Sequence, residues 1–413
     1  KIDMRKNKLK KKKLPLRDSL KRKILFIAIV CYSLTAIVFI FGFGAYQWTI
    51  DKNGDEIYRF SENYAFGKGV NPYEVMLGNA PQLDVKISDR AGTAPYNFIF
   101  YYLLHFSDSN KAVATTVVFC FYILALIGSS IIIYRYVRPK TDFYVALLCT
   151  LVFLSQYGVG VAFGFGNYAL FTYFFILLLA YTNFCESRPI IGGFMLGLGM
   201  MKPQTMMPFF VPLIIKRRIL IVSISVATVI IAFLLACYIL STSPIDLFKD
   251  FSEQSKSATN ISNAYCGPIS SIGTVLTGGK ATDFLHVSFI IFLIFTFIIC
   301  WKYRNIEKDY TFIIPAAIST VWTYSYACNS TGVYILWAIP IIIDFFSREK
   351  ISLFRLSLYI ITLSIMLAYL PRHTLGLPTS LFPFAEDIYR IFMVFMAFFI
   401  VIKRDTFAKG YKK

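Results

Sequence analysis

Charged side chains are scarce in this sequence. Asp, Glu, Lys and Arg make up only 16% of its 413 residues, whereas 57% of the residues are hydrophobic and the mean hydropathy is +0.61. A water-soluble protein of this size needs much more polar material to cover its surface. The scarcity of charge therefore excludes a soluble globule and predicts a protein that uses lipid as its solvent.

Metal-ligand clusters are missing as well. The chain has only three histidines, and its eight cysteines lack the spacing typical of a metal site. Cys266 and Cys328 both fall on the side expected to face outward, so a disulfide between them is an open alternative to two free thiols. The other six cysteines lie in or beside apolar segments, where a thiol acts as a small apolar side chain: Cys31, Cys120, Cys149, Cys185, Cys237 and Cys300. We expect no metal ion and no other cofactor.

Two further absences narrow the function. No segment expected on the inner side is long enough to form a nucleotide-binding domain, which disfavours a nucleotide sugar as substrate. The sequence also shows no internal repeat, although such repeats are typical of many secondary transporters.

The positive charge is unevenly placed. The formal net charge is +19, and much of it lies in residues 1–23, directly before the first apolar run. Lys and Arg in that position hold a tail on the cytoplasmic side and attract anionic lipid. Basic and aromatic residues are not interleaved as they are in RNA- or DNA-binding surfaces, so we expect the lipid bilayer and not a nucleic acid as partner.

Long apolar runs fill most of the remaining sequence. Several approach the roughly 20 residues that cross a bilayer as a helix, and they are apolar on all sides, unlike the alternating strands of a membrane barrel. The run at residues 24–44 is longer than the apolar core of a signal peptide and is interpreted as the first membrane helix. The predicted fold class is an all-α polytopic integral membrane protein with about ten to twelve transmembrane or re-entrant helices.

Short basic loops set the expected topology, because Lys and Arg concentrate on the cytoplasmic side of the cell membrane. They place both tails, residues 1–23 and 403–413, in the cytoplasm, with a single membrane domain over residues 24–402. The expected crossings are 24–44, 112–134, 143–163, 168–183, 219–240, 284–301, 312–326, 333–346, 353–370 and 384–402.

Three segments of this domain are not ordinary crossings. Residues 49–111 and 241–283 are expected to be outward-facing loops, and the first includes an interfacial helix at residues 96–106. Residues 190–215 contain two apolar pieces of about a dozen residues each, too short to span the bilayer separately. We interpret them as a hairpin of short helices broken at Lys202-Pro203.

Carboxylates concentrate in the first outward segment, near the membrane. Asp51, Asp55 and Glu56 lie just beyond the first apolar run. A carboxylate held at that boundary can have a raised pKa and act as a general base toward a hydroxyl group. The residues alone leave a solvated acidic loop open as an alternative, since exposed carboxylates are common.

Several short motifs occur in a characteristic order. Asp55-x-x-Tyr58, followed by Gly67-x-Gly69 and Asn71-Pro72-Tyr73, resembles the first-loop signature of glycosyltransferase family 87, which belongs to the GT-C class. The resemblance covers roughly residues 25 to 340 and continues through Pro95-Tyr96, Gly166-Asn167, Gly193-x3-Gly197-x-Gly199 ending at Lys202-Pro203, and residues 325–337. The chain departs from the family at one place: Phe165 and Gly166 stand where members commonly have Gln.

The resemblance implies a GT-C-like helix bundle and a specific reaction. Family members move one sugar, mannose or another hexose or pentose, from a polyprenyl-phosphate carrier to a lipid-linked glycan, glycolipid or cell-wall polysaccharide on the outer face, with inversion at the anomeric carbon. Asp55 matches the first-loop aspartate that serves as their general base. Asp51 and Glu56 flank it and remain alternatives for that role.

The departing lipid phosphate needs positive groups to offset its charge. Lys202 is the first candidate, because an ammonium at a break in an apolar hairpin is costly without an anionic partner. Its alternative role is that of a snorkelling or carboxylate-paired lysine. Further candidates for binding substrate are Tyr58, Asn71, Tyr73, Asn167, Arg372 and His373.

Two other functions share some of these features. A transporter or flippase would also use broken helices and an intramembrane lysine, but it would concentrate polar residues near the midplane. A polysaccharide polymerase or ligase would favour a large late outer loop with paired arginines, whereas residues 241–283 contain lysines and no arginine.

Overall fold

The computed structural model describes residues 19–49, 54–80, 83, 93–105, 111–181, 188–262, 285–302, 304, 315–316 and 335–347. Within these ranges 84% of the residues are helical and none is in a strand. The predicted all-α class is therefore confirmed. The expected crossings 353–370 and 384–402, and nearly all of 312–326, lie outside the described ranges.

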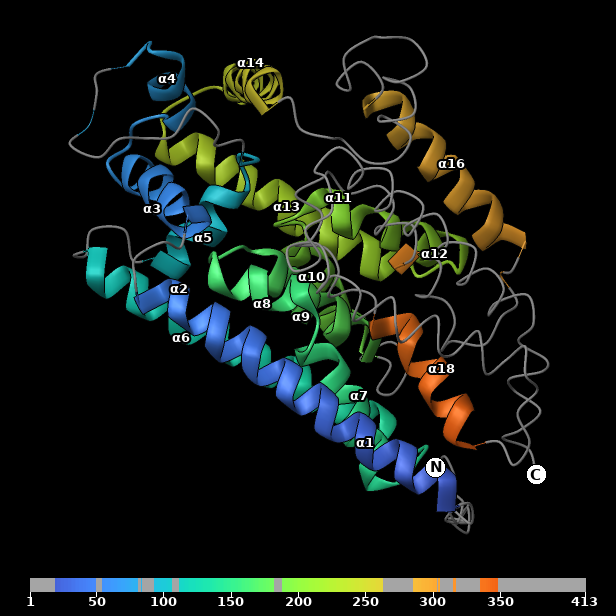
Figure 1. Ribbon diagram of the computed structural model, residues 1–413. Coiled ribbons are helices and arrows are strands. Elements are labelled where there is room, and N and C mark those ends of the chain that lie inside the picture. Colours follow the sequence, from blue (N-terminus) through green and yellow to red (C-terminus); the bar gives the residue numbers. More distant parts are fainter. Residues whose placement is uncertain are drawn as a thin grey trace, which may run out of the picture.

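Three helices in the described ranges are long and apolar enough to cross a membrane. The first is a continuous rod at residues 20–48, the second is α6 (Lys111–Val137), and the third is α13 (Ile219–Ile239). In Figure 1 these helices run in a similar direction, together with α16 (Leu285–Lys302). Their parallel arrangement is typical of a membrane bundle, and the total of about ten to twelve helices stays a prediction.

The rod at residues 20–48 is not a regular α-helix throughout. It comprises α1 (Ser19–Ala36), a π-helix η1 (Ile37–Ala45) and α2 (Tyr46–Thr49). The π-helix packs very closely against α8 (Tyr157–Gly164): a Cβ added at Gly160 would lie 2.8 Å from the Cβ of Phe39. Small residues on α8 let the two backbones approach, as is common between membrane helices.

The expected crossing at residues 143–163 is bent in the structure. It consists of α7 (Phe143–Leu154) and α8, whose axes differ by 55°. The break falls at Ser155 and Gln156, where the Ser155 hydroxyl donates back to the carbonyl of Val152 at 3.1 Å. A hydroxyl that bonds to the preceding turn competes with the helical ladder and favours such a bend. If the bent pair is counted as one span, the described ranges hold up to four candidate spans.

The hairpin at residues 190–215 is broken next to Pro203. Helix α10 (Pro189–Gly199) ends before the break, and α11 (Pro203–Met206), the 3-10 turn η3 (Met207–Phe209) and α12 (Phe210–Ile215) follow it. Helix α10 packs on α13 through glycines. A Cβ on Gly193 would lie 2.6 Å from the Cβ of Ile224, and one on Gly197 would lie 2.9 Å from the Cβ of Thr228. This part of the glycine motif therefore serves helix packing.

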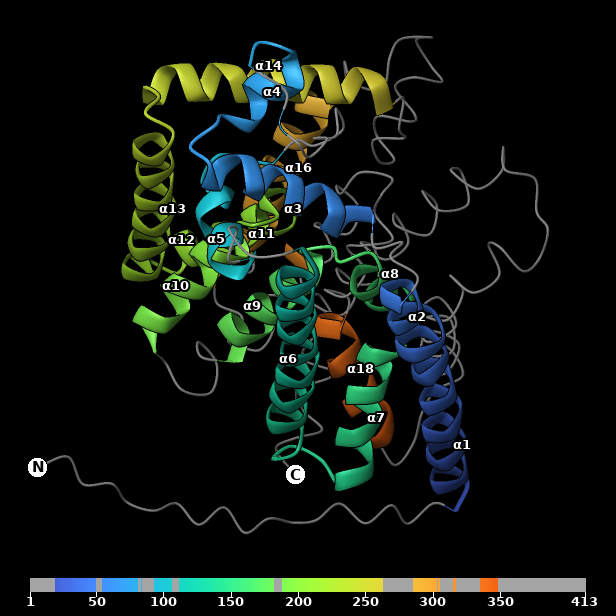
Figure 2. The same cartoon turned by 90° about the vertical axis from the view of Figure 1, so that its left-hand side faces the viewer.

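Polar helices gather at one end of the bundle. Figure 2 shows α3 (Gly54–Gly67), α4 (Pro72–Leu77) and α14 (Pro244–Ser262) at the end remote from the start of α1, with α5 (Asn97–His105) beneath α3. Sequence analysis treats residues 241–283 as a polar loop, but α14 is a helix of 19 residues. Its residues Leu247 and Phe251 pack with Tyr73 and Phe98, and this apolar contact orders the helix.

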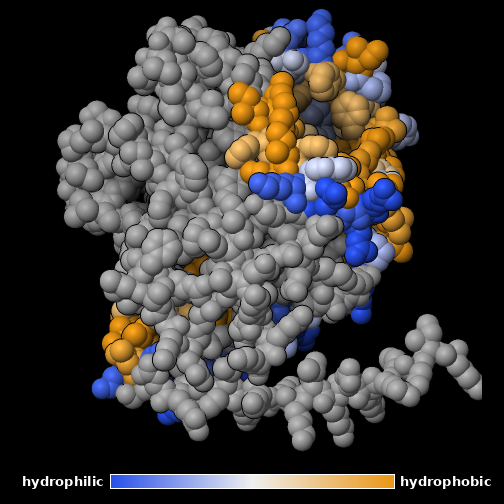
Figure 3. Space-filling model, turned by 90° about the vertical axis from the view of Figure 1, so that its right-hand side faces the viewer, coloured by the Kyte–Doolittle hydropathy of each residue, from blue (hydrophilic) through white to orange (hydrophobic). Residues whose placement is uncertain are grey.

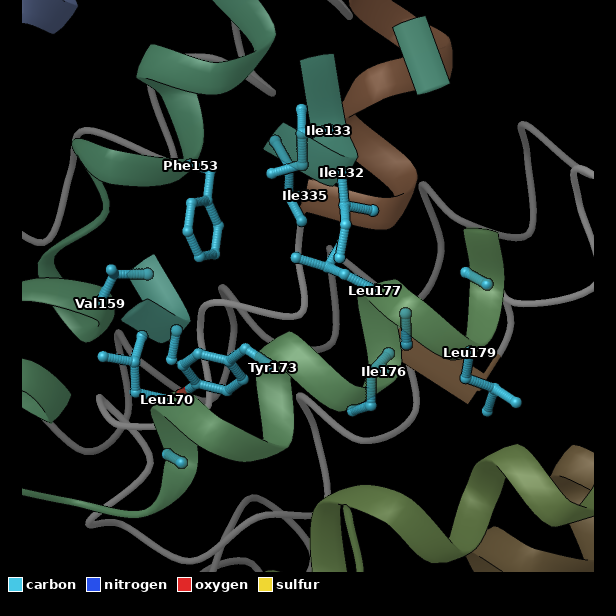
Figure 4. Packing of buried hydrophobic residues seen from close by; sticks show 14 of the residues in the cluster. Ile132, Ile133, Phe153, Val159, Leu170, Tyr173, Ile176, Leu177, Leu179 and Ile335 are labelled. Atoms are coloured by element: carbon cyan, nitrogen blue, oxygen red, sulfur yellow. The ribbon is translucent and has the colours of Figure 1, made fainter. Parts of the chain in front are cut away.

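A continuous hydrophobic core joins the helices below this polar end. Figure 4 shows side chains from α6, α7, α8, α9 (Ala169–Tyr181) and α18 (Ile335–Ser347) meeting in it. Large apolar side chains on the outside of α13 and α16 remain exposed, as lipid-facing surfaces require. Figure 3 shows apolar side chains on this side of the molecule above a band of hydrophilic ones.

Candidate active site

Helices α3 and α4, which form part of the polar end, are joined by a turn. Helix α3 gives way to Gly69, whose φ of +71° lies in the left-handed region that favours glycine. Asn71 then caps α4: its Oδ1 accepts from the backbone N–H of Tyr73 at 3.1 Å, and Pro72 occupies the first turn. Most of the first-loop signature is thus explained by the need to build this turn.

Asn71 and Tyr73, both expected to bind substrate, make structural contacts. The Nδ2 of Asn71 donates to Oδ2 of Asp250 at 2.8 Å, which ties α4 to α14. Tyr73 is fully buried, and its hydroxyl donates to the backbone carbonyl of Thr93. Burial raises the pKa of Tyr73 well above its usual value, and the Glu62 carboxylate adds to the effect. Tyr73 therefore stays a hydrogen-bond donor.

A buried ion pair lies beside this contact. Nη1 of Arg59 donates to both carboxylate oxygens of Glu62, at 2.8 and 2.7 Å, and also donates to the hydroxyl of Thr93. That hydroxyl donates in turn to Glu62 Oε2 at 2.6 Å. The Glu62 side chain is completely buried, whereas 21% of the Arg59 side chain is exposed. The ion pair is therefore open on its cationic side.

The Arg59 guanidinium also lies over an aromatic stack. Its carbon is 6.0 Å from the ring centre of Tyr168, which stacks on Tyr101 with centroids 3.8 Å apart. Burial alone lowers the pKa of Arg59, but the Glu62 carboxylate and the two tyrosines outweigh burial and raise it. Arg59 is a permanent cation held between a carboxylate and a ring.

The same stack leads to the break in the hairpin. The carbonyl of Met201 accepts from Asn97 Nδ2 at 3.2 Å and from the Tyr101 hydroxyl at 3.5 Å. The carbonyl of Met200 accepts from the Tyr96 hydroxyl at 3.2 Å. A backbone break at membrane depth is tolerated only where other groups satisfy the freed carbonyls. Helix α5 and the residue before it provide these groups.

Lys202 occupies the break itself. It is half-buried and directly precedes α11. Met201, its neighbour, bonds to Tyr101, and Tyr101 stacks on the ring beneath Arg59. A continuous chain of contacts therefore joins α3 to the hairpin break, and it contains a cation at each end.

Asn167, another expected substrate contact, forms part of a turn between α8 and α9. Gly166 has a φ of +64°, and Oδ1 of Asn167 accepts from the backbone N–H of Ala169 at 2.9 Å. The following residue, Tyr168, belongs to the aromatic stack. The turn thus helps to position the ring that lies under Arg59.

The remaining expected site residues are described only in part. The backbones of Asp55, Glu56 and Tyr58 belong to the first turns of α3, and their side chains lie outside the description. The other positions lie outside the described ranges altogether: Asp51, Cys266, Cys328, Arg372 and His373. Over the residues whose placement is described, no group of three or more His, Cys, Asp or Glu side chains could hold a metal ion.

Comparison with known families places this chain. The model of glycosyltransferase family 87 matches residues 95–326, more than half of the sequence. The chain belongs to glycosyltransferase family 87. No curated protein matches it. The family assignment predicted from the sequence is confirmed, and the protein is a glycosyltransferase with membrane helices.

The family 87 match begins at the residue that precedes Tyr96. It therefore includes α5, the turn at Asn167, the broken hairpin and α14, whereas α3 with Asp55 comes before it. Sequence analysis missed Arg59, Glu62 and Thr93. The spacing of Arg59 and Glu62, three residues apart in a helical segment, is the signal that could have revealed the ion pair.

Proposed function

We propose that this protein is an inverting glycosyltransferase that takes its sugar from a polyprenyl-phosphate carrier on the outer face of the cell membrane. The acceptor is a lipid-linked glycan, a glycolipid or a cell-wall polysaccharide. The observation that carries the proposal is the match to family 87. Helices α3, α4 and α14 gather at the end remote from the start of α1, and the basic residues that precede α1 in the sequence favour a cytoplasmic start of that helix, which supports an outward-facing site.

The proposed reaction is a single displacement. Asp55 takes the proton from the acceptor hydroxyl as its oxygen bonds to the anomeric carbon. The bond between that carbon and the phosphate oxygen breaks on the opposite side, and polyprenyl phosphate leaves with the electron pair. Inversion follows from this geometry. Lys202 offsets the negative charge on the departing phosphate. The protein supplies all of these groups, so the scheme needs no metal ion or cofactor.

The decisive experiment is sugar transfer in proteoliposomes. Purified wild-type protein receives a panel of radiolabelled polyprenyl-phosphate sugars together with a membrane extract as acceptor. Asp55→Asn keeps the shape of the side chain but removes the base, so we expect transfer to fall by a factor on the order of 10² to 10⁴. Glu253→Gln, which changes an exposed carboxylate on α14, is the matched control and should retain transfer.

Two other results would redirect the assignment. Transfer that survives Asp55→Asn would move the base to Asp51 or Glu56, each of which can be tested in the same way. If no donor in the panel supports transfer by the folded wild-type protein, the carrier-dependent mechanism fails, and transport of a lipid-linked substrate becomes the next function to measure.

A further inference from the structure

Among the described residues, the contacts of the Arg59 guanidinium with hydrogen-bond acceptors involve one of its three nitrogens. Every hydrogen bond of its guanidinium to the described residues comes from Nη1 and goes to Glu62 or Thr93. Within the part of the chain that the structure describes, no group accepts from Nη2 or Nε. The side chain is 21% exposed, although Glu62 is completely buried. Three N–H bonds of a fixed cation are therefore available to a ligand.

Contacts on two sides fix the position of the guanidinium. Glu62 and Thr93 set the position of Nη1, and the ring of Tyr168 lies under the plane at 6.0 Å. A planar fork that is already ordered loses little entropy when it binds an oxyanion, and it matches two oxygens of a phosphate at once. This arrangement suits a phosphate group better than a flexible lysine does.

The position on α3 adds a functional argument. Positions 55 and 59 are one helical turn apart on α3 and therefore share one face of the helix. In a displacement at an anomeric carbon, the base and the leaving phosphate lie on opposite sides of one sugar ring. A phosphate-binding group is therefore needed within a short distance of the base.

We propose that Arg59 binds two phosphate oxygens of the lipid-phosphate substrate through Nη2 and Nε. This inference rests on the proposed function and adds a residue to it. Glu62 balances the charge of Arg59, and Lys202, at the other end of the contact chain, supplies the additional positive charge. The ligand class is an alkyl phosphate: a phosphodiester in the donor and a phosphomonoester in the product.

The test is direct binding in detergent. Farnesyl phosphate serves as the probe, and inorganic phosphate and phosphatidylglycerol are added separately to distinguish a carrier phosphate from a free ion or a lipid headgroup. Arg59→Lys keeps the charge next to Glu62 but removes the fork. We expect it to raise the Kd for farnesyl phosphate about tenfold, equivalent to about 1.4 kcal/mol. Lys249→Met, at an exposed position on α14, should leave the Kd unchanged.

A structural role alone would give a different pattern. If Arg59 only stabilises the fold, Arg59→Lys would lower the melting temperature and leave the Kd of the folded fraction at the wild-type value, which overturns the inference. Equal competition by inorganic phosphate or phosphatidylglycerol would overturn the carrier as the ligand. Binding that depends on Arg59 without sugar transfer from any donor would leave the phosphate site standing and reject the proposed reaction. If sugar transfer depends on Asp55 but Arg59→Lys leaves the Kd for farnesyl phosphate unchanged, the proposed reaction stands and the phosphate site at Arg59 is rejected.

A second inference concerns α14 and comes from a separate observation. Three different sectors run along this helix. Leu247 and Phe251 face the protein, Lys249 and Glu253 form a charged sector, and the third sector presents Ile245 and Phe248, which are 80% and 61% exposed. Phe248 is an unusually large apolar group to leave in water.

The end of α13 that is followed by α14 also has exposed large side chains. Tyr238, near the end of α13, is 82% exposed, and Leu234 and Leu235 below it are also exposed. Figure 2 shows α14 lying across the end of α13, as an interfacial helix lies across a membrane-spanning one. We infer that Ile245 and Phe248 insert into the lipid at the membrane surface, while Lys249 and Glu253 face water.

Quenching of a fluorescent amino acid tests this inference. The amino acid is introduced at residue 248 or, as the matched control, at residue 253 of the full chain in vesicles. Lipids with a nitroxide on the acyl chain should quench the label at residue 248 at least about threefold more than the label at residue 253, and iodide in water should show the opposite order. Equal quenching at both positions by both agents would reject insertion, and so would stronger iodide quenching at residue 248.

Discussion

Arg59 and Lys202 are two cations with different surroundings in the structure. Side chains fix the position of Arg59: a buried carboxylate, a hydroxyl and an aromatic ring lie around its guanidinium. Lys202 lies at a break in the backbone, where donors from the α5 segment bond to the carbonyls of Met200 and Met201. The Arg59 guanidinium therefore has a fixed orientation, whereas Lys202 lies at a helix break that hydrogen bonds from the α5 segment stabilise.

The difference matters for stability, because a charged group and a neutral carbonyl depend on their partners to different degrees. A buried charge is stable only with partners, so the Arg59 cluster is sensitive to the loss of any partner. The carbonyls freed at the helix break are neutral groups, and their stability depends on several moderate hydrogen bonds. Substitutions in the two regions should therefore differ in the size of their effect.

The largest effect is expected from Glu62→Gln. It leaves the Arg59 guanidinium without its counter-charge, and loss of one partner of a buried pair costs about 3 to 5 kcal/mol. Thermal unfolding in detergent should show a large decrease in melting temperature. Replacing both residues, in Arg59→Met with Glu62→Leu, should restore much of the stability. If Glu62→Gln is as stable as wild type, the stability of the protein does not depend on the pairing of Arg59 with Glu62.

The next effect concerns the packing that holds the break in place. Gly193→Ala puts a Cβ 2.6 Å from the Cβ of Ile224 and 3.0 Å from the carbonyl of Ile221, so α10 must move away from α13. We expect a loss of about 1 to 3 kcal/mol in unfolding free energy. Gly42→Ala is the matched control, because a Cβ there meets nothing within 4 Å. If both variants lose the same stability, the close approach of the helices is not what Gly193 provides.

The pH dependence of stability tests the burial of the Tyr73 hydroxyl beside the Glu62 carboxylate. Because the pKa of Tyr73 is raised in the folded state, the folded protein retains this proton more tightly than the unfolded chain. The stabilisation is fully present below the unfolded pKa of about 10 and is lost above it, by about 1.4 kcal/mol per pH unit. Between wild type and Tyr73→Phe, the difference in unfolding free energy should shrink as the pH rises through this window. A constant difference would show that burial does not raise the pKa of Tyr73 in the folded protein.

The smallest effects are expected at the carbonyls of the break. Asn97→Leu removes the donor at 3.2 Å from the Met201 carbonyl and should cost about 1 to 2 kcal/mol, while Tyr101→Phe removes a contact of 3.5 Å and should cost less than about 0.5 kcal/mol. Chemical denaturation of the two variants gives the comparison. An equal cost would mean that the carbonyl bonds do not decide the stability of the break.

Much of the local architecture could be predicted from the chain alone. Pro203 marked the break in the hairpin, and the long apolar runs marked α6 and α13 to within a few residues. These features depend on neighbouring residues, through the missing N–H of proline and the length of a bilayer-crossing helix. The bend at Ser155 and Gln156 was not predictable in the same way, because the segment is apolar on both sides of it.

The candidate site also has features that could be predicted from the sequence and features that could not. Asp55 and Lys202 were proposed from their sequence context and stay predictions, whereas the chain of contacts from Arg59 through Tyr168 and Tyr101 to Met201 could not be predicted. Asn71 and Asn167 were assigned to substrate, and the structure gives each a capping bond that sequence analysis did not foresee. Capping asparagines and ligand-binding asparagines have the same residue type, so only their neighbours in space distinguish them.

The sequence by itself determined that this protein lives in lipid, is helical and belongs to family 87, because hydropathy, segment length and motif order are properties of the chain. The tertiary structure decided which polar groups meet. Arg59 and Tyr168 are more than a hundred residues apart, and so are Asn97 and Met201. Such contacts arise only when helices pack, because burial in a low-dielectric interior favours polar groups that pair with partners from other parts of the chain.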